Sequence, residues 1–278
     1  MYRQIIEYRA CKILYNFIVS NHMSGLVAMP VNICSDVVDT IKVAGLVPYF
    51  LDIDSQTLCL DEIELMRISK DVQMLIYVHT YGLDNTVDMT FRKLHSINPS
   101  IIIVDDRCLC KYSQVINTES DVVLFSTGPR KMVDLGMGGI AYIDDKWKYE
   151  TQIDNSGFLT ESFWVFNEEE YLKRETEVLN HKSILNQIYL SELPAQIKLP
   201  EEYQSWRFNI FVDNKKHILD TLFSANLFAG GHYKPICSGC KNADYLYEHV
   251  INLFNDQYYT EEQALKTCEI INRELSRR

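Results

Sequence analysis

Short apolar runs alternate with helix-like stretches from residue 26 to residue 145, and this alternation is the strongest limit on the fold. Runs rich in Val, Ile, Leu and Phe predict strands at 26–30, 46–54, 74–82, 100–107, 122–126 and 138–145. Apolar residues at helical spacing predict helices at 35–45 and 61–70. Strands interleaved with helices form βαβ units, so we predict an α/β fold with a mainly parallel sheet covered by helices. The last of these strands is expected to be antiparallel or at the edge.

The pattern changes after about residue 146, which predicts two domains, a large α/β domain at 1–150 and a smaller one at 151–278. In the second part we expect a polar helix at 161–191, a strand at 207–214, a helix at 215–227, a loop at 232–254 and a helix at 260–275. Thr260, with Glu262 close behind, has the pattern of a helix N-terminal cap. The C-terminal domain is therefore expected to be α+β.

Charge and composition exclude several classes of partner. The chain has 38 acidic and 27 basic residues, a net charge of −11, and no Lys/Arg-rich run, which argues against a nucleic-acid or anionic-membrane surface. The first 19 residues lack the uninterrupted apolar core of a signal peptide, and no apolar run is long enough to span a bilayer. Eight scattered cysteines indicate reduced thiols and a cytoplasmic protein.

One cysteine pair has a spacing that could bind zinc or act in redox chemistry. Cys237 and Cys240 form a C-x-x-C motif. A zinc site needs a second pair, and Cys108 and Cys110 are only two residues apart, which is poor spacing for a tetrahedral site. We therefore predict a turn that holds two thiols and no metal.

Polar residues follow the predicted strands at the points where they end. If the strands are parallel, these ends meet at the edge where ligands bind in open α/β sheets. The polar residues there lie at 30–32, 52–54, 79–81, 105–106 and 126–131. Taken singly, Lys131 could be a solvated loop charge, Asp105 and Asp106 could cap a turn, and His79 could be a satisfied polar residue. Together they predict a site.

Two chemistries fit a lysine and an aspartate in one pocket. In the first, Lys131 forms a Schiff base with pyridoxal phosphate, and an aspartate keeps the pyridine nitrogen protonated. Ser126 and N–H groups at a helix start would then bind the phosphate. In the second, the sheet binds a nucleotide in the Rossmann manner and the lysine is a general acid. That alternative needs a glycine-rich turn after the first strand, and residues 29–36 contain no glycine.

Four stretches in this order resemble the DegT/DnrJ/EryC1/StrS family, the fold-type-I aminotransferases of nucleotide-sugar biosynthesis. They are MPVNICSDVVDTIKVAGLVPYFLDID, IYVHTYG, IIIVDD and FSTGPRKMVDLGMGG. The tail HYKPICSGCKNADYLYEHVINLF resembles the C-terminal domain of the family, where a His-Tyr-x-Pro turn precedes an Asn-Ala helix. The resemblance covers most of the chain, with a weak patch at about 146–205. It implies the PLP-dependent transferase fold of type I, in a shortened form.

The resemblance also implies roles for individual residues. The Schiff-base lysine of the family falls on Lys131 and its pyridine-nitrogen aspartate on Asp106, so these are the implied catalytic residues. The implied cofactor contacts are Arg9, Ala10, Asn32, His79, Asp106, Ser126 and Lys131. Arg9 and Ala10 lie in the N-terminal phosphate loop, and Ser126 is the phosphate-binding serine. The dehydratase branch of the family has histidine in place of this lysine and is disfavoured.

The sequence departs from the family at three places. Leu109 stands where many members have glutamine, Val31 and Asn32 where an aromatic residue lies near the cofactor ring, and Tyr8 where the phosphate loop has glycine. Each lost hydrogen bond would weaken cofactor binding by about 1 kcal/mol.

The resemblance therefore implies a PLP-dependent transaminase that acts on a nucleotide-linked keto sugar, with glutamate as amino donor. Family members are homodimers in which the partner chain completes each active site, and the same is expected here. The alternative is a non-catalytic or altered relative that serves as a binding or assembly subunit. The three departures favour this alternative, and the retained Lys131 and Asp106 oppose it.

Overall fold

A seven-stranded sheet is the centre of the computed structural model, which describes residues 1–85, 87–115, 117–152, 157, 159 and 162–277. Its strand order is β1-β7-β6-β5-β4-β2-β3. The strands are β1 Tyr2–Glu7, β2 Leu26–Pro30, β3 Val47–Leu51, β4 Met74–Val78, β5 Ile102–Asp106, β6 Val122–Ser126 and β7 Gly139–Asp144. Strands β2 to β6 pair in parallel, which confirms the predicted mainly parallel sheet.

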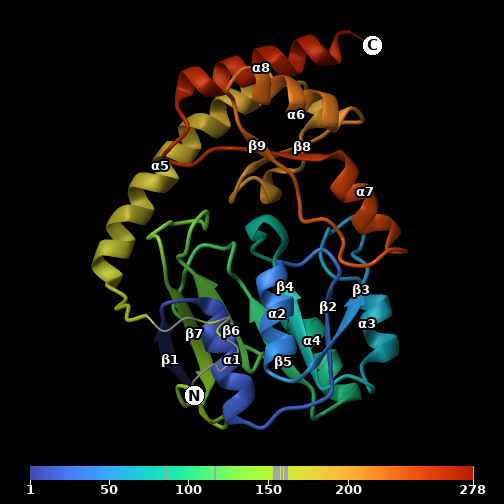
Figure 1. Ribbon diagram of the computed structural model, residues 1–278, viewed down its shortest axis with the longest axis vertical. Coiled ribbons are helices and arrows are strands. Elements are labelled where there is room, and N and C mark those ends of the chain that lie inside the picture. Colours follow the sequence, from blue (N-terminus) through green and yellow to red (C-terminus); the bar gives the residue numbers. More distant parts are fainter. Residues whose placement is uncertain (86, 116, 153–156, 158, 160–161, 278) are drawn as a thin grey trace.

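Helices cover both faces of this sheet (Figure 1). They are α1 Ala10–Ser20, α2 Ser35–Val43, α3 Glu62–Ile68 and α4 Asp88–Ile97. Phe17 of α1 and Ile41 of α2 pack in one apolar core with Val104 of β5. Leu65 of α3 and Phe91 of α4 pack with the opposite face of the sheet. Because the inner strands β2, β4, β5, β6 and β7 bury side chains on both faces, they have nearly continuous apolar sequences. The predicted α/β class is confirmed.

The edge of the sheet differs from the prediction. Strand β7 is antiparallel to β6, as expected, but β1 pairs on its outer side, with Tyr2 opposite Asp144. No strand was predicted at β1. Its sequence, YRQIIE, has no strict alternation of polar and apolar residues, and its residues are partly buried or exposed.

A smaller antiparallel sheet forms the C-terminal part, in the order β8-β10-β9. Its strands are β8 Phe208–Phe211, β9 Ala229–Gly230 and β10 Val250–Leu253, and the accompanying helices are α5 Glu168–Glu192, α6 Lys215–Ser224, α7 Lys241–His249 and α8 Glu261–Leu275. This agrees with the predicted α+β C-terminal part, while the division at residue 150 stays a prediction. Glu161, where a helix was predicted to begin, lies outside the described residues.

The loop predicted at 232–254 from the sequence pattern is wrong, because this stretch contains α7 and β10. The Asn-Ala helix that the resemblance implied there is present, since α7 includes Asn242 and Ala243. The amides of these two residues donate to Asp52, from Asn242 N at 3.0 Å and from Ala243 N at 2.9 Å. This cap comes from a distant part of the chain, so the local sequence does not show it.

The predicted cap of α8 is confirmed at Thr260. Its capping box is completed by Gln263 and not by Glu262.

The C-terminal part lies against the carboxyl ends of the parallel strands (Figure 1). Ile236 N donates to Val31 O at 3.0 Å, just after β2. Trp206 N donates to Tyr81 O at 3.4 Å, just after β4. Within the described residues, none of the helices combines the length and the apolar content that a membrane span needs.

A buried lysine lies where this C-terminal part meets the large sheet. Lys182 of α5 is 4% exposed, and its Nζ donates to Trp206 O at 2.6 Å and to Asn255 Oδ1 at 2.8 Å. Burial lowers the pKa of Lys182 to about 7; Arg207 lowers it further and Asp256 opposes the shift. The folded protein therefore holds Lys182 mostly neutral above neutral pH.

We predict that Lys182 makes the stability of the protein depend on pH. An unfolded chain keeps lysine protonated up to about pH 10.4, so above about pH 7 the unfolded state binds the extra proton. This contribution makes the free energy of unfolding rise with pH, by at most about 1.4 kcal/mol per pH unit. We would measure the free energy of unfolding in urea at several pH values between 7 and 9. It should rise less steeply with pH in Lys182→Met than in the wild type. The exposed Lys216→Met is the control, and equal slopes in Lys182→Met and wild type would contradict the prediction.

Candidate active site

Lys131 lies in a loop closed by backbone hydrogen bonds just after β6. Thr127 N donates to Gly138 O at 3.0 Å, and Leu135 N donates to Thr127 O at 2.8 Å. Within the loop, Asp134 Oδ2 accepts from Arg130 N at 2.8 Å. These bonds hold a partly exposed Lys131 at the carboxyl edge of the sheet, where the sequence predicts it.

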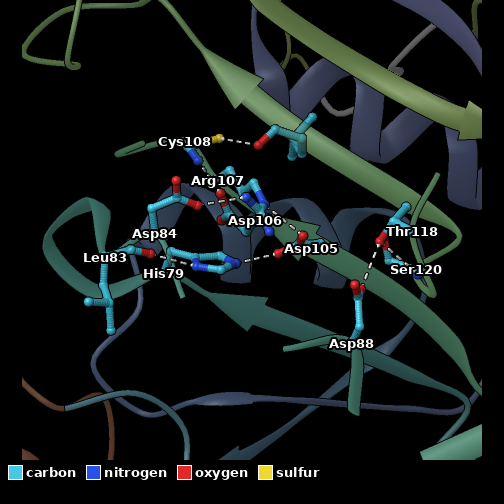
Figure 2. A network of polar contacts seen from close by, with 11 residues as sticks. His79, Leu83, Asp84, Asp88, Asp105, Asp106, Arg107, Cys108, Thr118 and Ser120 are labelled. Atoms are coloured by element: carbon cyan, nitrogen blue, oxygen red, sulfur yellow. Dashed lines mark hydrogen bonds and ion pairs between the residues drawn. The ribbon is translucent and has the colours of Figure 1, made fainter. Parts of the chain in front are cut away.

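The two adjacent aspartates at the end of β5 face opposite sides of the sheet. Asp105 accepts from His79 Nε2 at 2.6 Å and from Arg107 Nε at 2.8 Å, as Figure 2 shows. Asp106 instead accepts from Cys108 N through Oδ1 at 2.9 Å. Side chains alternate along a strand, so Asp106 shares the face of Val104, against which α1 and α2 pack. Of the two aspartates, Asp106 lies on the face covered by α1 and α2, and Asp105 lies on the opposite face.

His79 belongs with Asp105. Its ring is fully buried, and Nδ1 lies 2.8 Å from Leu83 O while Nε2 lies 2.6 Å from Asp105 Oδ1. Both partners are oxygen acceptors, so each ring nitrogen already faces a hydrogen-bond partner within the protein. Neither nitrogen is left for a ligand, and the predicted cofactor contact of His79 stays a prediction.

Asp105 is an ionised carboxylate in spite of its burial. Burial raises the pKa of Asp105, but hydrogen bonds and charge from His79 and Arg107 lower it by more, so its pKa lies below the ordinary value. The Asp105 side chain is 1% exposed, and its carboxylate contacts both the buried His79 and the partly exposed Arg107. This aspartate is therefore a structural ion-pair partner.

The charges of Lys131 and Asp106 both influence the pKa of the buried Cys108 thiol. Burial raises the pKa of Cys108, the charge of Asp106 raises it further, and the charge of Lys131 opposes the shift. Cys108 packs in the core beneath α1 and α2. The structure thus brings Lys131 and Asp106 to the same side of the sheet.

A helix N-terminus meets Ser126 beside this loop. Ser126 Oγ donates to Gly138 O at 3.2 Å, and Gly138 N donates to Tyr8 O at 2.7 Å, just before α1. A Cβ on Gly139 would lie 2.3 Å from Ala10 N, so only glycine allows the helix to approach this closely. The helix has no side-chain cap at Arg9 and no acidic residue in its first turn. Its positive end is therefore suited to an anion.

The remaining predicted contacts differ in how free their side chains are. Arg9 forms an ion pair with Asp36 at 2.6 Å, so its guanidinium is already engaged. Asn32 is 5% exposed, and its Nδ2 has no hydrogen-bond partner. An unpaired buried donor is costly, so this amide is available to a ligand.

Residues after β9 form a second layer above this edge. The His232 ring lies 5.1 Å from the ring of Tyr81, edge to face. Burial lowers the pKa of His232 to about 4, with Lys215 lowering it further and the backbone of Asn32 opposing, so the imidazole is neutral at pH 7. The sequence reasoning did not select His232 as a site residue, although the resemblance included its His-Tyr-x-Pro turn.

The C-x-x-C motif lies at the end of the same segment. Cys237 is exposed, and Cys240 is the residue before α7. Burial raises the pKa of Cys240 to about 12, and Asp52 and Cys237 raise it further. Among the described residues, no group of three or more His, Cys, Asp or Glu side chains could hold a metal ion.

Comparisons with known proteins agree on one family and one fold. The model of the DegT/DnrJ/EryC1/StrS aminotransferase family matches residues 25–170, just over half of the chain. No curated protein gave a significant match. Many solved structures share the fold at low sequence identity.

Three of these structures are typical. An aminotransferase from Helicobacter pylori, involved in pseudoaminic acid biosynthesis, is 14% identical with a TM-score of 0.78, over 98% of this chain and 86% of that one. A putative sugar aminotransferase from Streptococcus pneumoniae in its PMP form is 17% identical with a TM-score of 0.78, over 99% and 88%. A DegT/DnrJ/EryC1/StrS aminotransferase from Brucella abortus is 15% identical with a TM-score of 0.75, over 98% and 86%.

We predict that Asp105 is needed for stability because its buried carboxylate is the shared partner of His79 and Arg107. Asp105→Asn would remove the carboxylate that both side chains contact and should lower the free energy of unfolding by about 3 kcal/mol. Asp84→Asn is the matched control, because Asp84 also pairs with Arg107 but is 87% exposed, and it should cost less than about 0.5 kcal/mol. Denaturant unfolding measures both, and equal losses would contradict the assignment.

Proposed function

The chain belongs to the DegT/DnrJ/EryC1/StrS aminotransferase family, and on that premise we propose that it is a pyridoxal-phosphate-dependent transaminase. We propose a nucleotide-linked keto sugar as its substrate and glutamate as its amino donor. Several solved proteins of this fold are sugar aminotransferases, which supports a sugar substrate.

The observation that supports this proposal most is the grouping of Lys131, Asp106 and Ser126 on one side of the carboxyl edge. Asp106 pairs in register with Leu124, two residues before Ser126, so the two side chains share one face of the sheet. Lys131 follows in the loop five residues after Ser126. The carboxylate and the hydroxyl therefore share one face of the sheet edge, and the lysine loop follows directly from the same strand end.

The residues at one end of this region fit a phosphate group. The uncapped N-terminus of α1 would offer at most the N–H groups that precede Lys12, whose own N–H already donates to Arg9 O at 3.1 Å. Ser126 adds a hydroxyl beside it. Close packing of α1 against Gly139 holds the two together. Arg9 would contribute through its backbone, because its side chain is paired with Asp36.

The other end fits a pyridine ring. Asp106 is 7% exposed, and among the described residues it forms no ion pair. A carboxylate in this position would keep a pyridine nitrogen protonated. The unpaired Nδ2 of Asn32 would donate to an oxygen of the ring or of the substrate.

Pyridoxal phosphate, when bound, supplies an aldehyde that captures amines and a ring that withdraws electrons. Lys131 would anchor the cofactor through Nζ. Once the amino donor displaces it, the free amine of Lys131 would take the proton from the donor carbon and return it to the cofactor side. Throughout the reaction, the negative charge of Asp106 would keep the pyridine nitrogen protonated.

We predict that the cofactor attaches to Lys131. Protein loaded with pyridoxal phosphate and reduced with borohydride should give a single labelled peptide by mass spectrometry, with the label on Lys131. Lys131→Met should lose the label, whereas Lys234→Met, which changes an exposed lysine near the same edge, should keep it. A label on another lysine, or none at saturating cofactor, would overturn the proposed role.

An alternative function is favoured by a specific contact. The Arg9 side chain is held by Asp36 at the phosphate end, and Tyr8 fills the place of the family glycine, 5% exposed. Both features would weaken cofactor binding and suit an altered relative that acts as a binding or assembly subunit. The homodimer and the cytoplasmic location also stay predictions.

We predict that glutamate aminates the bound cofactor, slowly, which separates the two functions. The absorbance spectrum of the loaded protein should change to that of the pyridoxamine form after glutamate is added. Asp106→Asn should keep the Lys131 label but slow this change at least about 100-fold, since each factor of ten needs only about 1.4 kcal/mol. A spectrum unmoved by glutamate, glutamine, aspartate and alanine would favour the non-catalytic relative.

A further inference from the structure

The residue before Lys131 has an unusual backbone conformation. Arg130 has a φ of 63°, in the left-handed region that side chains other than those of glycine and asparagine rarely adopt. Such a conformation persists only where the surrounding structure fixes it. The hydrogen bonds that fix the backbone of Arg130 therefore also fix the position of the Lys131 Cα and the direction of its Cα–Cβ bond.

Both polar groups of the peptide unit between Arg130 and Lys131 are hydrogen-bonded. Its N–H, on Lys131, donates to Gly128 O at 3.3 Å within the loop. Its carbonyl, on Arg130, accepts from Trp206 Nε1 at 2.8 Å. Because a peptide unit is planar and rigid, fixing its two ends fixes its orientation. That orientation sets the direction in which the Cα of Lys131 presents its side chain.

Trp206 is itself held by two other parts of the chain and by its neighbour Arg207. Its indole stacks on the ring of Tyr81, with centroids 6.4 Å apart and planes 6° apart. Its carbonyl accepts from the buried Lys182, and the guanidinium of Arg207 lies 5.3 Å from its ring. The indole N–H is thus a fixed donor, supplied by the C-terminal part of the chain to the lysine loop.

We propose that Trp206 is a positioning residue for Lys131. Through its indole N–H, the direction of the Lys131 side chain depends on how the C-terminal part packs on the sheet edge. The proposal rests on the proposed function, in which Lys131 anchors the cofactor. Trp206 acts through the Arg130 carbonyl and takes no part in proton transfer.

Trp206→Phe is the direct test, because phenylalanine keeps an aromatic ring against Tyr81 and removes the N–H, together with part of the apolar area of the indole. Trp147→Phe is a matched control. Trp147 also donates its indole N–H, to Asp121 Oδ1 at 2.9 Å, but at the opposite end of the sheet. Both variants should lower the unfolding temperature by similar amounts. Two further readouts then separate positioning from stability.

The first readout is hydrogen exchange in the cofactor-free protein, measured by mass spectrometry. Trp206→Phe should speed exchange in the peptide that covers residues 128–136, and Trp147→Phe should not. The second is the dissociation constant of pyridoxal phosphate. It should rise about tenfold in Trp206→Phe, the equivalent of about 1.4 kcal/mol, and stay near the wild-type value in Trp147→Phe.

The outcomes distinguish this proposal from the proposed function. If the wild type binds no pyridoxal phosphate at Lys131, the proposed function fails, and hydrogen exchange alone decides whether Trp206 orders the loop. If the wild type binds it and Trp206→Phe binds equally well, Trp206 does not position Lys131. Equal exchange at residues 128–136 in Trp206→Phe and wild type overturns the proposal in either case.

Discussion

The structure depends on the alternation of side chains at the end of β5. Two adjacent buried aspartates would repel each other if they faced one pocket, and burial of an unpaired carboxylate is costly. The strand sends Asp105 to one face, where His79 and Arg107 neutralise it, and Asp106 to the other. The Asp105 carboxylate thus links the end of β5 to His79, just after β4. The Asp106 carboxylate forms no such ion pair among the described residues. The positions of Lys131, Ser126 and α1 matter only because they surround that second carboxylate.

Much of the fold was readable because a buried parallel strand has a continuous apolar sequence. The strands β2 to β7 all have such sequences, and each was predicted to within a few residues. The failures have a common cause, which is dependence on distant partners. Strand β1 is defined by its pairing with β7, and α7 is capped by Asp52, almost two hundred residues earlier in the chain. Neither partner is visible in a local window of sequence.

The candidate site follows the same rule. Lys131, Asp106 and Ser126 could be grouped from sequence because parallel strands bring their carboxyl ends to one edge. The pairing of His79 with Asp105 needs the register of β4 against β5, in which Val78 lies opposite Asp106. Trp206 gave no local signal, since its role depends on a hydrogen bond to a backbone carbonyl 76 residues away.

The pairing of β1 with β7 has a consequence for the order in which the chain can fold during synthesis. The sequence of β1 leaves the ribosome well before that of its partner β7, which ends at Asp144, so β1 has nothing to pair with while more than a hundred residues are made. Until then α1, which follows β1 directly, cannot rest its first turn on Gly139. The N-terminal end of this helix therefore reaches its place only after the lysine loop has been translated, and the earliest and latest elements of the large sheet complete this edge together.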